Sequence, residues 1–329
     1  MKLRKGRAIG ALFLIIMIPL VLFIACTSHS KNKNSSKVKT TAAEVKDLTT
    51  SVTVPQAAEV TTTITTIAHI SSPSCHGAAV YSLDSGQIIY SDNIDKRTAP
   101  ASLTKLLTAS VALKYLKTTD VFTVGSEQWL VEPYSSLCYL EPGNVLTLKD
   151  LLTGMLMSSG NDAAYTIAVS TARKLHPEKE LTDTEAVDIF CGLMNDFAAE
   201  LGMKNSHFVN PDGWDDDDEY TTISDLLKLA GYAMTVPEIE EIEGTFQKSV
   251  DIISGEHFDW TNSNLLLDPY SDYYCKEAFG MKTGTTLNAG HNLIAAFRRN
   301  GRTYITVVVG CEYDEDRYEL TLKLFDKCR

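Results

Sequence analysis

The stretch "NLIAAFRRNGRTYITVVVGC", residues 292–311, holds two runs rich in apolar and β-branched residues joined by Asn300-Gly301. An Asn-Gly pair between such runs is the strongest short-range signal for a β-hairpin. A second hairpin is predicted near the other end of the globular part, where "AAVYSL" and "QIIYS" (residues 78–91) flank Asp84-Ser85-Gly86. The sequence therefore predicts antiparallel strand pairs at both ends of one domain.

Segments with helical periodicity lie between and after these strands. They are "SLTKLLTASVALKYL" (102–116), "LTLKDLLTGMLM" (146–157), "DTEAVDIFCGLMNDFAAELG" (183–202) and "DEDRYELTLKLFDKC" (314–328). The last one has acids in its first turn and Lys near its end, as a closing helix favours. Together the segments predict a mixed α/β (α+β) fold, in which both termini build an antiparallel sheet, helices flank it, and a helical insert lies between.

The first residues direct the chain to a membrane. Lys2, Arg4, Lys5 and Arg7 precede the apolar run Ala8–Ala25, which is long for a signal peptide and just long enough to cross a bilayer. Cys26 follows "LFIA", which resembles a bacterial lipoprotein cleavage site. A lipid anchor, an uncleaved N-terminal helix and a secreted protein remain open. In all three the remainder is expected outside the cytoplasmic membrane.

Composition divides the chain into three parts. Residues 1–26 are expected to be a signal peptide or membrane anchor, and residues 27–74, rich in Ser, Thr and Lys, a flexible linker. Residues 75–329 are expected to form a single globular, catalytic domain. No second domain is expected after the closing helix.

Charge and motifs exclude several functions. Residues 1–46 hold nine of the 30 Lys and Arg residues but one of the 42 acidic residues, so the remainder has a formal net charge of −20. Nucleic acid is therefore not an expected partner. The His residues form no H-E-x-x-H motif, and the Cys residues form no C-x-x-C pair and give no disulfide pairing. We expect no metal and no cofactor.

The pattern S-x-x-K at Ser102 and Lys105 has two interpretations. Ser102 follows Pro100-Ala101 and can be an ordinary helix N-cap, with Lys105 on the helix surface. Alternatively, residues i and i+3 share one helix face, so a buried, neutral Lys105 can take the proton of Ser102. Three further matches, at Ser28/Lys31, Ser30/Lys33 and Ser36/Lys39, lie in the predicted linker.

Two more motifs are each weak alone. Ser159-Gly160-Asn161 lies between predicted helices, where it is either a helix stop or a loop that presents a hydroxyl and an amide together. Lys282-Thr283-Gly284 precedes the C-terminal strand pair, so it is either a turn or an edge strand facing a groove. On the second interpretation Gly284 lets a substrate backbone come close.

In this order, S-x-x-K, S-x-N and K-T-G are the signature of penicillin-binding proteins and class A β-lactamases. The chain resembles the low-molecular-mass penicillin-binding proteins, which are serine-type D-alanyl-D-alanine carboxypeptidases. "SGNDA" (159–163), "GMKNSHFVNPDGW" (202–214) and the C-terminal strand pair carry the resemblance. It implies a β-lactamase/transpeptidase-like fold, peptidoglycan stem peptides as substrate, and β-lactams as inhibitors.

The resemblance also implies catalytic roles. Ser102 is expected to be the nucleophile that forms an acyl-enzyme with the penultimate D-Ala of the stem peptide, and Lys105 its general base. Ser159 is expected to pass a proton to the leaving amine. Asn161 is expected to hold Lys105 and the substrate amide.

The K-T-G segment is expected to bind the substrate. Lys282 would add positive potential and orient Ser159, and the backbone N–H groups of Ser102 and Thr285 would form an oxyanion hole. Thr283 and Thr286 are expected near the terminal carboxylate of the substrate. The expected substrate-binding residues are Lys282, Thr283, Gly284, Thr285 and Thr286.

The sequence also departs from the pattern of the resembled family. Family members often carry an Arg where this chain has Ser224, and a second Arg on the last strands that meets the substrate carboxylate. Arg302 is near the second position, with Thr303 where that Arg would fall. We expect this chain to lack the C-terminal β-rich domain and anchor helix of many members, and its N-terminal segment to replace that anchor.

Two alternatives to a carboxypeptidase stay open. One is a β-lactamase or related esterase, which needs an added deacylating carboxylate, and none stands out at a motif position. The other is a catalytically weak wall-binding or regulatory protein that keeps the fold.

Overall fold

The computed structural model of this protein describes residue 70 and residues 74–328. The predicted anchor (1–26), nearly all of the predicted linker (27–74) and three of the four S-x-x-K matches lie outside these residues. Among the described residues, no helix has both the length and the apolar character needed to cross a membrane.

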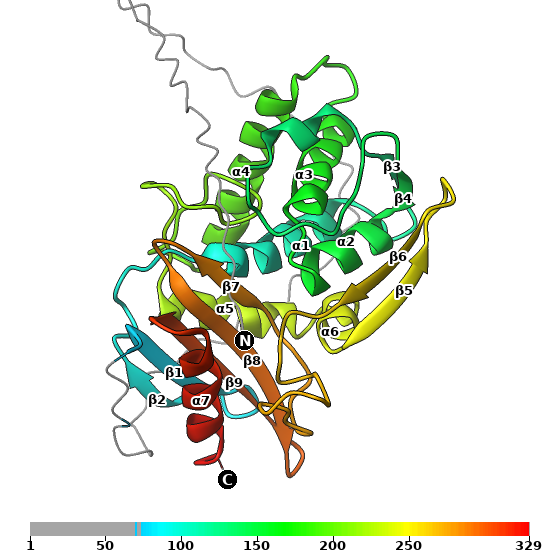
Figure 1. Ribbon diagram of the computed structural model, residues 1–329. Coiled ribbons are helices and arrows are strands. Elements are labelled where there is room, and N and C mark those ends of the chain that lie inside the picture. The colour runs from blue at the N-terminus through cyan, green and yellow to red at the C-terminus, as the bar shows by residue number, and fades with distance from the viewer. Residues whose placement is uncertain (1–69, 71–73, 329) are drawn as a thin grey trace, which may run out of the picture. The chain divides into compact units, whose positions relative to one another are not determined.

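A five-stranded antiparallel sheet joins the two ends of the described chain (Figure 1). The strand order is β2-β1-β9-β8-β7, so the C-terminal hairpin lies in the middle and β7 forms one edge. The strands of this sheet are β1 (Gly77–Ser82), β2 (Gln87–Asp92), β7 (Thr283–Thr286), β8 (Gly290–Arg299) and β9 (Arg302–Cys311). Two separate ladders pair β3 (Val121–Thr123) with β4 (Val145–Thr147), and β5 (Gln247–Asp251) with β6 (His257–Thr261).

Both predicted hairpins are confirmed. Asn300 and Gly301 have φ values of 54° and 75°. Positive φ at both central residues defines the two-residue turn whose twist matches that of the flanking strands. β1 also pairs with β9 over its whole length, from Gly77 opposite Val309 to Ser82 opposite Tyr304. The sheet is therefore built from the two ends of the domain.

Seven helices and two 3₁₀ turns make up the rest of the regular structure in the described part. They are η1 (Ala101–Leu103), α1 (Thr104–Tyr115), η2 (Ser126–Leu130), α2 (Leu148–Met157), α3 (Asn161–Leu175), α4 (Asp183–Glu200), α5 (Ile223–Ala233), α6 (Pro237–Glu243) and α7 (Asp314–Phe325). The predicted helix over 146–157 begins only at Leu148, because Thr147 and Asp150 form a capping box that fixes the start.

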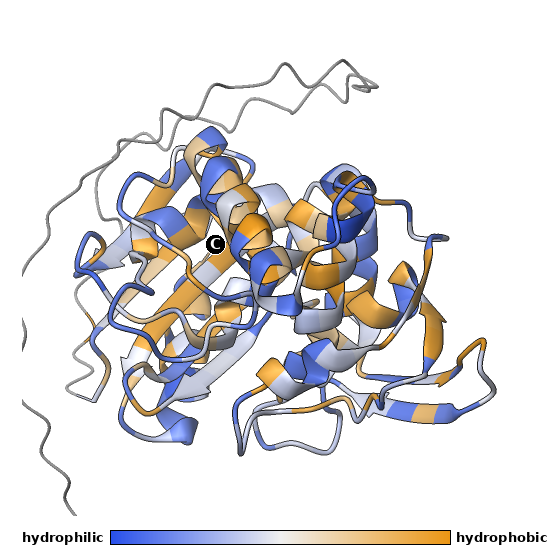
Figure 2. Ribbon diagram, turned by 90° about the horizontal axis from the view of Figure 1, so that it is seen from above, coloured by the Kyte–Doolittle hydropathy of each residue, from blue (hydrophilic) through white to orange (hydrophobic). Residues whose placement is uncertain are grey.

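Side chains from the two faces of the sheet enter two different cores. Along β1, Ala79 and Tyr81 point into the larger core under the helical part, whereas Ala78 and Val80 point into a second core with Leu320 and other residues of α7. Strands buried on both faces explain the nearly continuous apolar runs in the sequence. Hydrophilic residues are most frequent in the connecting loops (Figure 2).

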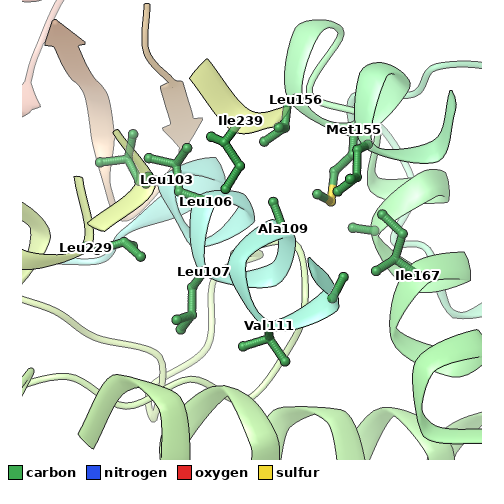
Figure 3. Packing of buried hydrophobic residues seen from close by; sticks show 14 of the residues in the cluster. Leu103, Leu106, Leu107, Ala109, Val111, Met155, Leu156, Ile167, Leu229 and Ile239 are labelled. Atoms are coloured by element: carbon green, nitrogen blue, oxygen red, sulfur yellow. The ribbon is translucent and has the colours of Figure 1, made fainter. Parts of the chain in front are cut away.

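Helix α1 runs through the middle of the larger core. Leu106, Leu107 and Val111 have no solvent exposure, and the side chains around α1 come from other helices, among them Met155 and Ile167 (Figure 3). The hydrophobic residues of α1 form no single stripe, as is typical of a helix buried on all sides. The core therefore fixes the start of α1, where Ser102 and Lys105 lie.

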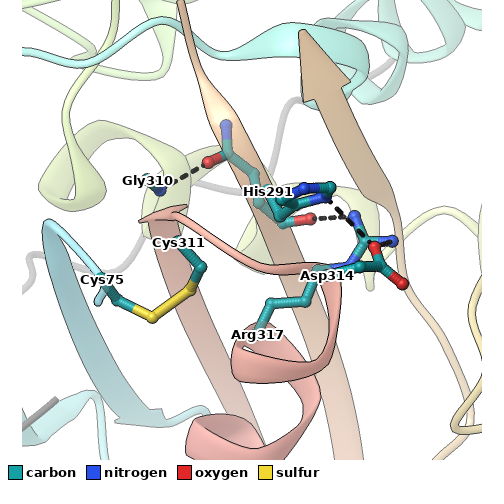
Figure 4. The surroundings of a disulfide bond; sticks show 7 residues. Cys75, His291, Gly310, Cys311, Asp314 and Arg317 are labelled. Carbon is teal, nitrogen blue, oxygen red and sulfur yellow. Dashed lines mark hydrogen bonds and ion pairs between the residues drawn. A yellow bond between two sulfur atoms is a disulfide. The ribbon is translucent and has the colours of Figure 1, made fainter. Parts of the chain in front are cut away.

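A disulfide bond joins Cys75, just before β1, to Cys311 at the end of β9 (Figure 4). The bond connects residues separated by 236 positions in the sequence. The sequence had left this pairing open. Cys191 is a free cysteine buried in the larger core.

Candidate active site

The turn that carries Ser102 is held by contacts from two distant segments. Ala101 has a φ of 51°, an uncommon conformation for a residue with a side chain. Asn292 of β8 donates hydrogen bonds to the carbonyl oxygens of Ala99 and Pro100, both 3.1 Å long. Gly213 packs so closely on the other side that a Cβ atom there would overlap the carbonyl oxygen of Ala101. These contacts fix the turn from outside the helix.

Ser102 does not cap a helix. Neither η1 nor α1 has a side-chain hydrogen bond at its N-terminal end. The hydroxyl of Ser102 instead accepts a hydrogen bond of 2.8 Å from Nζ of Lys105. The helix-cap interpretation of this S-x-x-K match is therefore wrong, and the pairing of Ser102 with Lys105 is present.

The position and the lowered pKa of Lys105 suit it to act as a base. Its side chain has no solvent exposure, and Nζ donates a second hydrogen bond of 2.8 Å to the carbonyl oxygen of Asp212. Burial lowers the pKa of Lys105 to about 7, since a buried ammonium loses its hydration. At neutral pH a large fraction of Lys105 is therefore an uncharged amine that can accept a proton from Ser102.

Ser159 lies in the turn between α2 and α3, as the sequence predicts, and Asn161 is the first residue of α3. Ser159 has a φ of 58°, and both side chains are buried. The backbone N–H of Asn161 donates to the carbonyl oxygen of Ser136, while its Oδ1 atom is buried without a hydrogen-bond partner. The expected contact between Asn161 and Lys105 is thus not made in this structure, because Lys105 bonds to Ser102 and Asp212.

Lys282 lies next to these groups, just before the edge strand β7. It is 1% exposed, and its Nζ atom has no hydrogen-bond partner. Burial lowers the pKa of Lys282 to about 8. The positive charge of Lys282 lowers the pKa of Lys105 by electrostatic repulsion. The hydroxyl of Thr283, next in sequence, bonds to Ser263 at 2.6 Å.

Gly284 lies against the turn that carries Ser102. A Cβ atom there would lie 3.0 Å from the backbone nitrogen of Ser102 and 3.2 Å from the carbonyl oxygen of Pro100. The missing side chain therefore lets β7 approach the chain's own serine turn. This approach puts the N–H of Ser102 beside the strand that carries Thr285.

The hydroxyls of Thr285 and Thr286 are linked to charged groups. Nη1 of Arg317 donates to Oγ1 of Thr285 at 3.2 Å, and His291 bonds to the same oxygen at 3.2 Å. Thr286 donates to Oδ1 of Asp215 at 2.5 Å. The far end of β7 therefore has a cation behind it and an acid beside it.

Arg302, which lies one position from where the second Arg of the resembled family would fall, is at the end of the sheet away from β7. It opposes Arg299 in the β8–β9 ladder, whereas the residues beside β7 are His291 and Cys311, at the other end of the ladder. The guanidinium that reaches β7 is that of Arg317 from α7 (Figure 4). The sequence does contain a signal for the burial of Arg317. Leu320 and Leu324 follow it at i+3 and i+7, so the three residues share the buried face of α7.

The acidic run Asp215–Glu219 is only partly the solvated loop that its composition suggests. Residues 216–218 are exposed, but Asp215 bonds to Thr286 and Glu219 is 3% exposed. Thr104 donates to Oε1 of Glu219 at 2.9 Å. Burial raises the pKa of Glu219 to about 8. One acid of the loop, Asp215, thus bonds to β7, and another, Glu219, bonds to the first residue of α1.

Sequence reasoning missed two further buried acids around the two lysines. Asp212 is 1% exposed with its Oδ2 atom unpartnered, and burial raises the pKa of its carboxyl group. Glu243, at the end of α6, is also 1% exposed. For Glu243 the signal was its position four residues after buried Ile239, on the inner face of the helix.

The family model described as D-alanyl-D-alanine carboxypeptidase matches residues 60–312 of this chain. Curated relatives include D-alanyl-D-alanine carboxypeptidase DacC of Escherichia coli, 34% identical over 78% of this chain and 62% of its own length. DacF of Bacillus subtilis is 29% identical over 76% of this chain and 60% of its own length. The chain thus spans about three fifths of the length of these relatives.

Solved structures share the fold. The Streptomyces K15 DD-transpeptidase superposes with a TM-score of 0.70 and 28% identity, over 77% of this chain and 96% of that protein. Penicillin-binding protein D2 from Listeria monocytogenes, in its ampicillin-bound form, gives a TM-score of 0.62 and 29% identity over the same shares. The expected β-lactamase/transpeptidase-like fold, with its antiparallel sheet and helical insert, is confirmed.

Proposed function

Because this chain belongs to the D-alanyl-D-alanine carboxypeptidase family, we propose that it is a serine carboxypeptidase that removes the terminal D-Ala from peptidoglycan stem peptides. The observation that carries the proposal is the hydrogen bond of 2.8 Å from Lys105 to Ser102. It joins a nucleophile to a base that burial keeps partly neutral at physiological pH. A structural Lys on a helix surface would be exposed and charged.

Acylation uses the residues around this pair. Oγ of Ser102 attacks the carbonyl carbon of the penultimate D-Ala, and its proton passes to Nζ of Lys105. The backbone N–H groups of Ser102 and Thr285 stabilise the oxyanion. The bond to the terminal D-Ala then breaks, and its nitrogen takes a proton relayed from Lys105 through Ser159. The product is an ester on Ser102 and free D-Ala.

Deacylation returns the enzyme to its starting state. Water attacks the ester carbonyl and gives one proton to the neutral Lys105. Lys105 passes this proton to Oγ of Ser102 as the ester bond breaks, and the shortened peptide leaves with a new terminal carboxylate. Asn161, whose Oδ1 is buried and unpartnered, is available to hold the substrate amide during both steps. A β-lactam would acylate Ser102 by the same attack, and its ring nitrogen would take the proton.

Recognition of the terminal carboxylate depends on the K-T-G strand. Lys282 lies at one end of the strand, and Arg317 donates to Thr285 toward the other. A carboxylate near Thr283, Thr285 and Thr286 would therefore lie between two cations. The positive charge behind Thr285 comes from α7 in this chain.

We also propose that the domain acts outside the cytoplasmic membrane, held there by the N-terminal segment through a lipid or a helix. The disulfide between Cys75 and Cys311 supports this location, since such bonds persist in oxidising compartments. The basic residues before Ala8–Ala25 support the orientation.

Fluorescent penicillin and a D-Ala-D-Ala pentapeptide test the function on the wild-type protein and on Ser102→Ala. Stable labelling and D-Ala release, both lost in the variant, are expected. Rapid turnover of the penicillin would assign a β-lactamase instead. No labelling and no D-Ala release would assign a wall-binding protein that keeps the fold.

A further inference from the structure

Glu243 has no role in the reaction described above. It is the last residue of α6 and is 1% exposed, and both of its carboxylate oxygens are buried without a hydrogen-bond partner among the described residues. A carboxylate in such a position is costly unless an opposite charge compensates it. The surroundings of Glu243 should therefore contain a cation.

The end of α6 packs directly against the segment that leads to Lys282. A Cβ atom at Gly280 would lie 3.4 Å from Cβ of Glu243. Asn262 donates a hydrogen bond of 3.1 Å to the carbonyl oxygen of Glu243, and its neighbour Asn264 donates one of 3.2 Å to that of Met281. Residues 243 and 280–282 are thus fixed side by side from the same loop.

Lys282 is the cation that Glu243 faces. Burial raises the pKa of Glu243 to about 7, and the charge of Lys282 opposes this rise. The charge of Glu243 likewise opposes the fall that burial causes in the pKa of Lys282. The other charged groups that act on Lys282 and its neighbours are Arg317 and Lys105, both positive, and they favour loss of its proton.

Each cation of the site then has its own acid. Arg317 forms an ion pair of 2.5 Å with Asp314, and Asp212 is the acid that most favours the charged form of Lys105. Glu243 completes the set for Lys282. The arrangement differs in one respect, because no hydrogen bond joins Glu243 to Lys282 and the Nζ atom of Lys282 remains unpartnered.

The lack of a hydrogen bond between Glu243 and Lys282 matters for the reaction. An acid bonded to Nζ would occupy the hydrogens that Lys282 needs for Ser159 and for the substrate. A buried acid beyond hydrogen-bond reach still stabilises the positive charge, because electrostatic interactions act over longer distances in a poorly screened interior.

We propose that Glu243 is a positioning residue for this reaction, which supplies the countercharge that keeps Lys282 a cation and leaves its hydrogens free. The inference rests on the function proposed above, since it acts through Lys282 of the substrate-binding strand.

The test is the pH profile of Ser102 acylation by fluorescent penicillin in wild-type protein and in Glu243→Gln. Without the countercharge Lys282 loses its proton at lower pH, so the falling limb of the profile should move to lower pH. A limb that moves down by one pH unit makes the rate at any pH on that limb about tenfold lower. Glu241→Gln is the matched control, because it removes the same charge from an exposed position of the same helix and should leave the profile unchanged.

The Lys282→Arg background separates charge from structure. A guanidinium stays protonated throughout the range, so the falling limb should be absent in that background with or without Glu243→Gln. A Glu243→Gln profile that superimposes on the wild-type profile would overturn the proposal, as would a falling limb that Glu243→Gln introduces in the Lys282→Arg background.

A stability cycle tests the same pair without reference to activity. Urea unfolding is measured for Glu243→Gln, Lys282→Gln and the double variant. If the two charges compensate each other, each single variant leaves one buried charge unpaired. The double variant should then lose less free energy of unfolding than the sum of the losses in the two single variants. Additive effects, or a double variant that alone fails to fold, would overturn the inference. Loss of labelling in the wild-type protein would instead refute the proposed function and leave this cycle interpretable.

Discussion

The amine of Lys105 lies 2.8 Å from the hydroxyl oxygen of Ser102 and is wholly shielded from solvent. Because Lys105 lies in the buried part of α1, its side chain cannot turn away from Ser102 without disturbing the core. The shielding from solvent lowers the pKa of Lys105, and the packing of α1 holds its amine within hydrogen-bond distance of Ser102.

The rate of acylation by a β-lactam should depend on pH as a bell. Lys105 must be neutral, and its pKa of about 7 makes the rate rise as the pH passes that value. Lys282 must be charged, and its pKa of about 8 makes the rate fall above that value. Second-order labelling rates from about pH 5 to 10 measure the profile. In Lys282→Arg the falling limb should disappear, and a wild-type rate that keeps rising to the highest pH would contradict the assignment.

Gly213→Ala should destabilise the domain and disturb the serine turn. The new Cβ atom would overlap the carbonyl oxygen of Ala101, and the φ of 83° at Gly213 is itself unfavourable for Ala. Gly202→Ala is the matched control, with a φ of 74° and no atom within 4 Å of the new Cβ. We expect a loss of about 1–2 kcal/mol in the control and clearly more in Gly213→Ala, measured by urea unfolding. Equal losses would show that the contact with Ala101 is unimportant.

Arg317→Gln should weaken the recognition of the substrate's terminal carboxylate. The variant removes the cation behind Thr285 and keeps a side chain of similar size. Release of the last residue from a D-Ala-D-Ala peptide should fall about 10- to 100-fold in kcat/KM, as expected for loss of a charged interaction. The corresponding peptide amide, which lacks the carboxylate, should be affected much less.

The exposed Arg298 supplies the control for that experiment. Arg298→Gln removes the same charge from β8, where the side chain pairs with Glu240 at 3.1 Å. It should leave the ratio of acid to amide turnover unchanged. A similar ratio in Arg317→Gln and in wild-type protein would count against a role of Arg317 in carboxylate recognition.

Replacing both Cys75 and Cys311 by Ser should lower the free energy of unfolding by about 2–5 kcal/mol, because the bond closes a long loop and restricts the unfolded chain. Urea unfolding under non-reducing conditions measures the loss. Cys275→Ser, at a free and partly buried cysteine, should have a small effect. Added reductant should destabilise the wild-type protein and leave the double variant unaffected.

Local patterns predicted the parts of this domain that local interactions determine. The Asn300-Gly301 turn and the i, i+3 pairing of Ser102 with Lys105 depend on neighbours in the sequence, so both could be predicted. The helical pattern places the start of α2 two residues early, because Thr147, whose hydroxyl caps the helix, is itself preceded by an apolar residue, Leu146.

Long-range contacts account for what the sequence left out. Asp212, Glu219 and Glu243 are acidic residues that a sequence assigns to the surface, and only the packing of distant segments shows that they are buried. The position of Arg302 also depends on long-range pairing, because it lies in β9 of the same sheet as β7. The register of that strand decides which end meets β7, and Arg302 is at the other end.

The bond between Cys75 and Cys311 also sets an order of events. Since 236 positions separate the two cysteines, the bond can close only after nearly the whole described chain has been delivered to the compartment where it is oxidised. Once it is closed, a single cut in any loop between them would leave two fragments still joined. Such a nicked molecule would migrate as one band on a gel until a reductant is added.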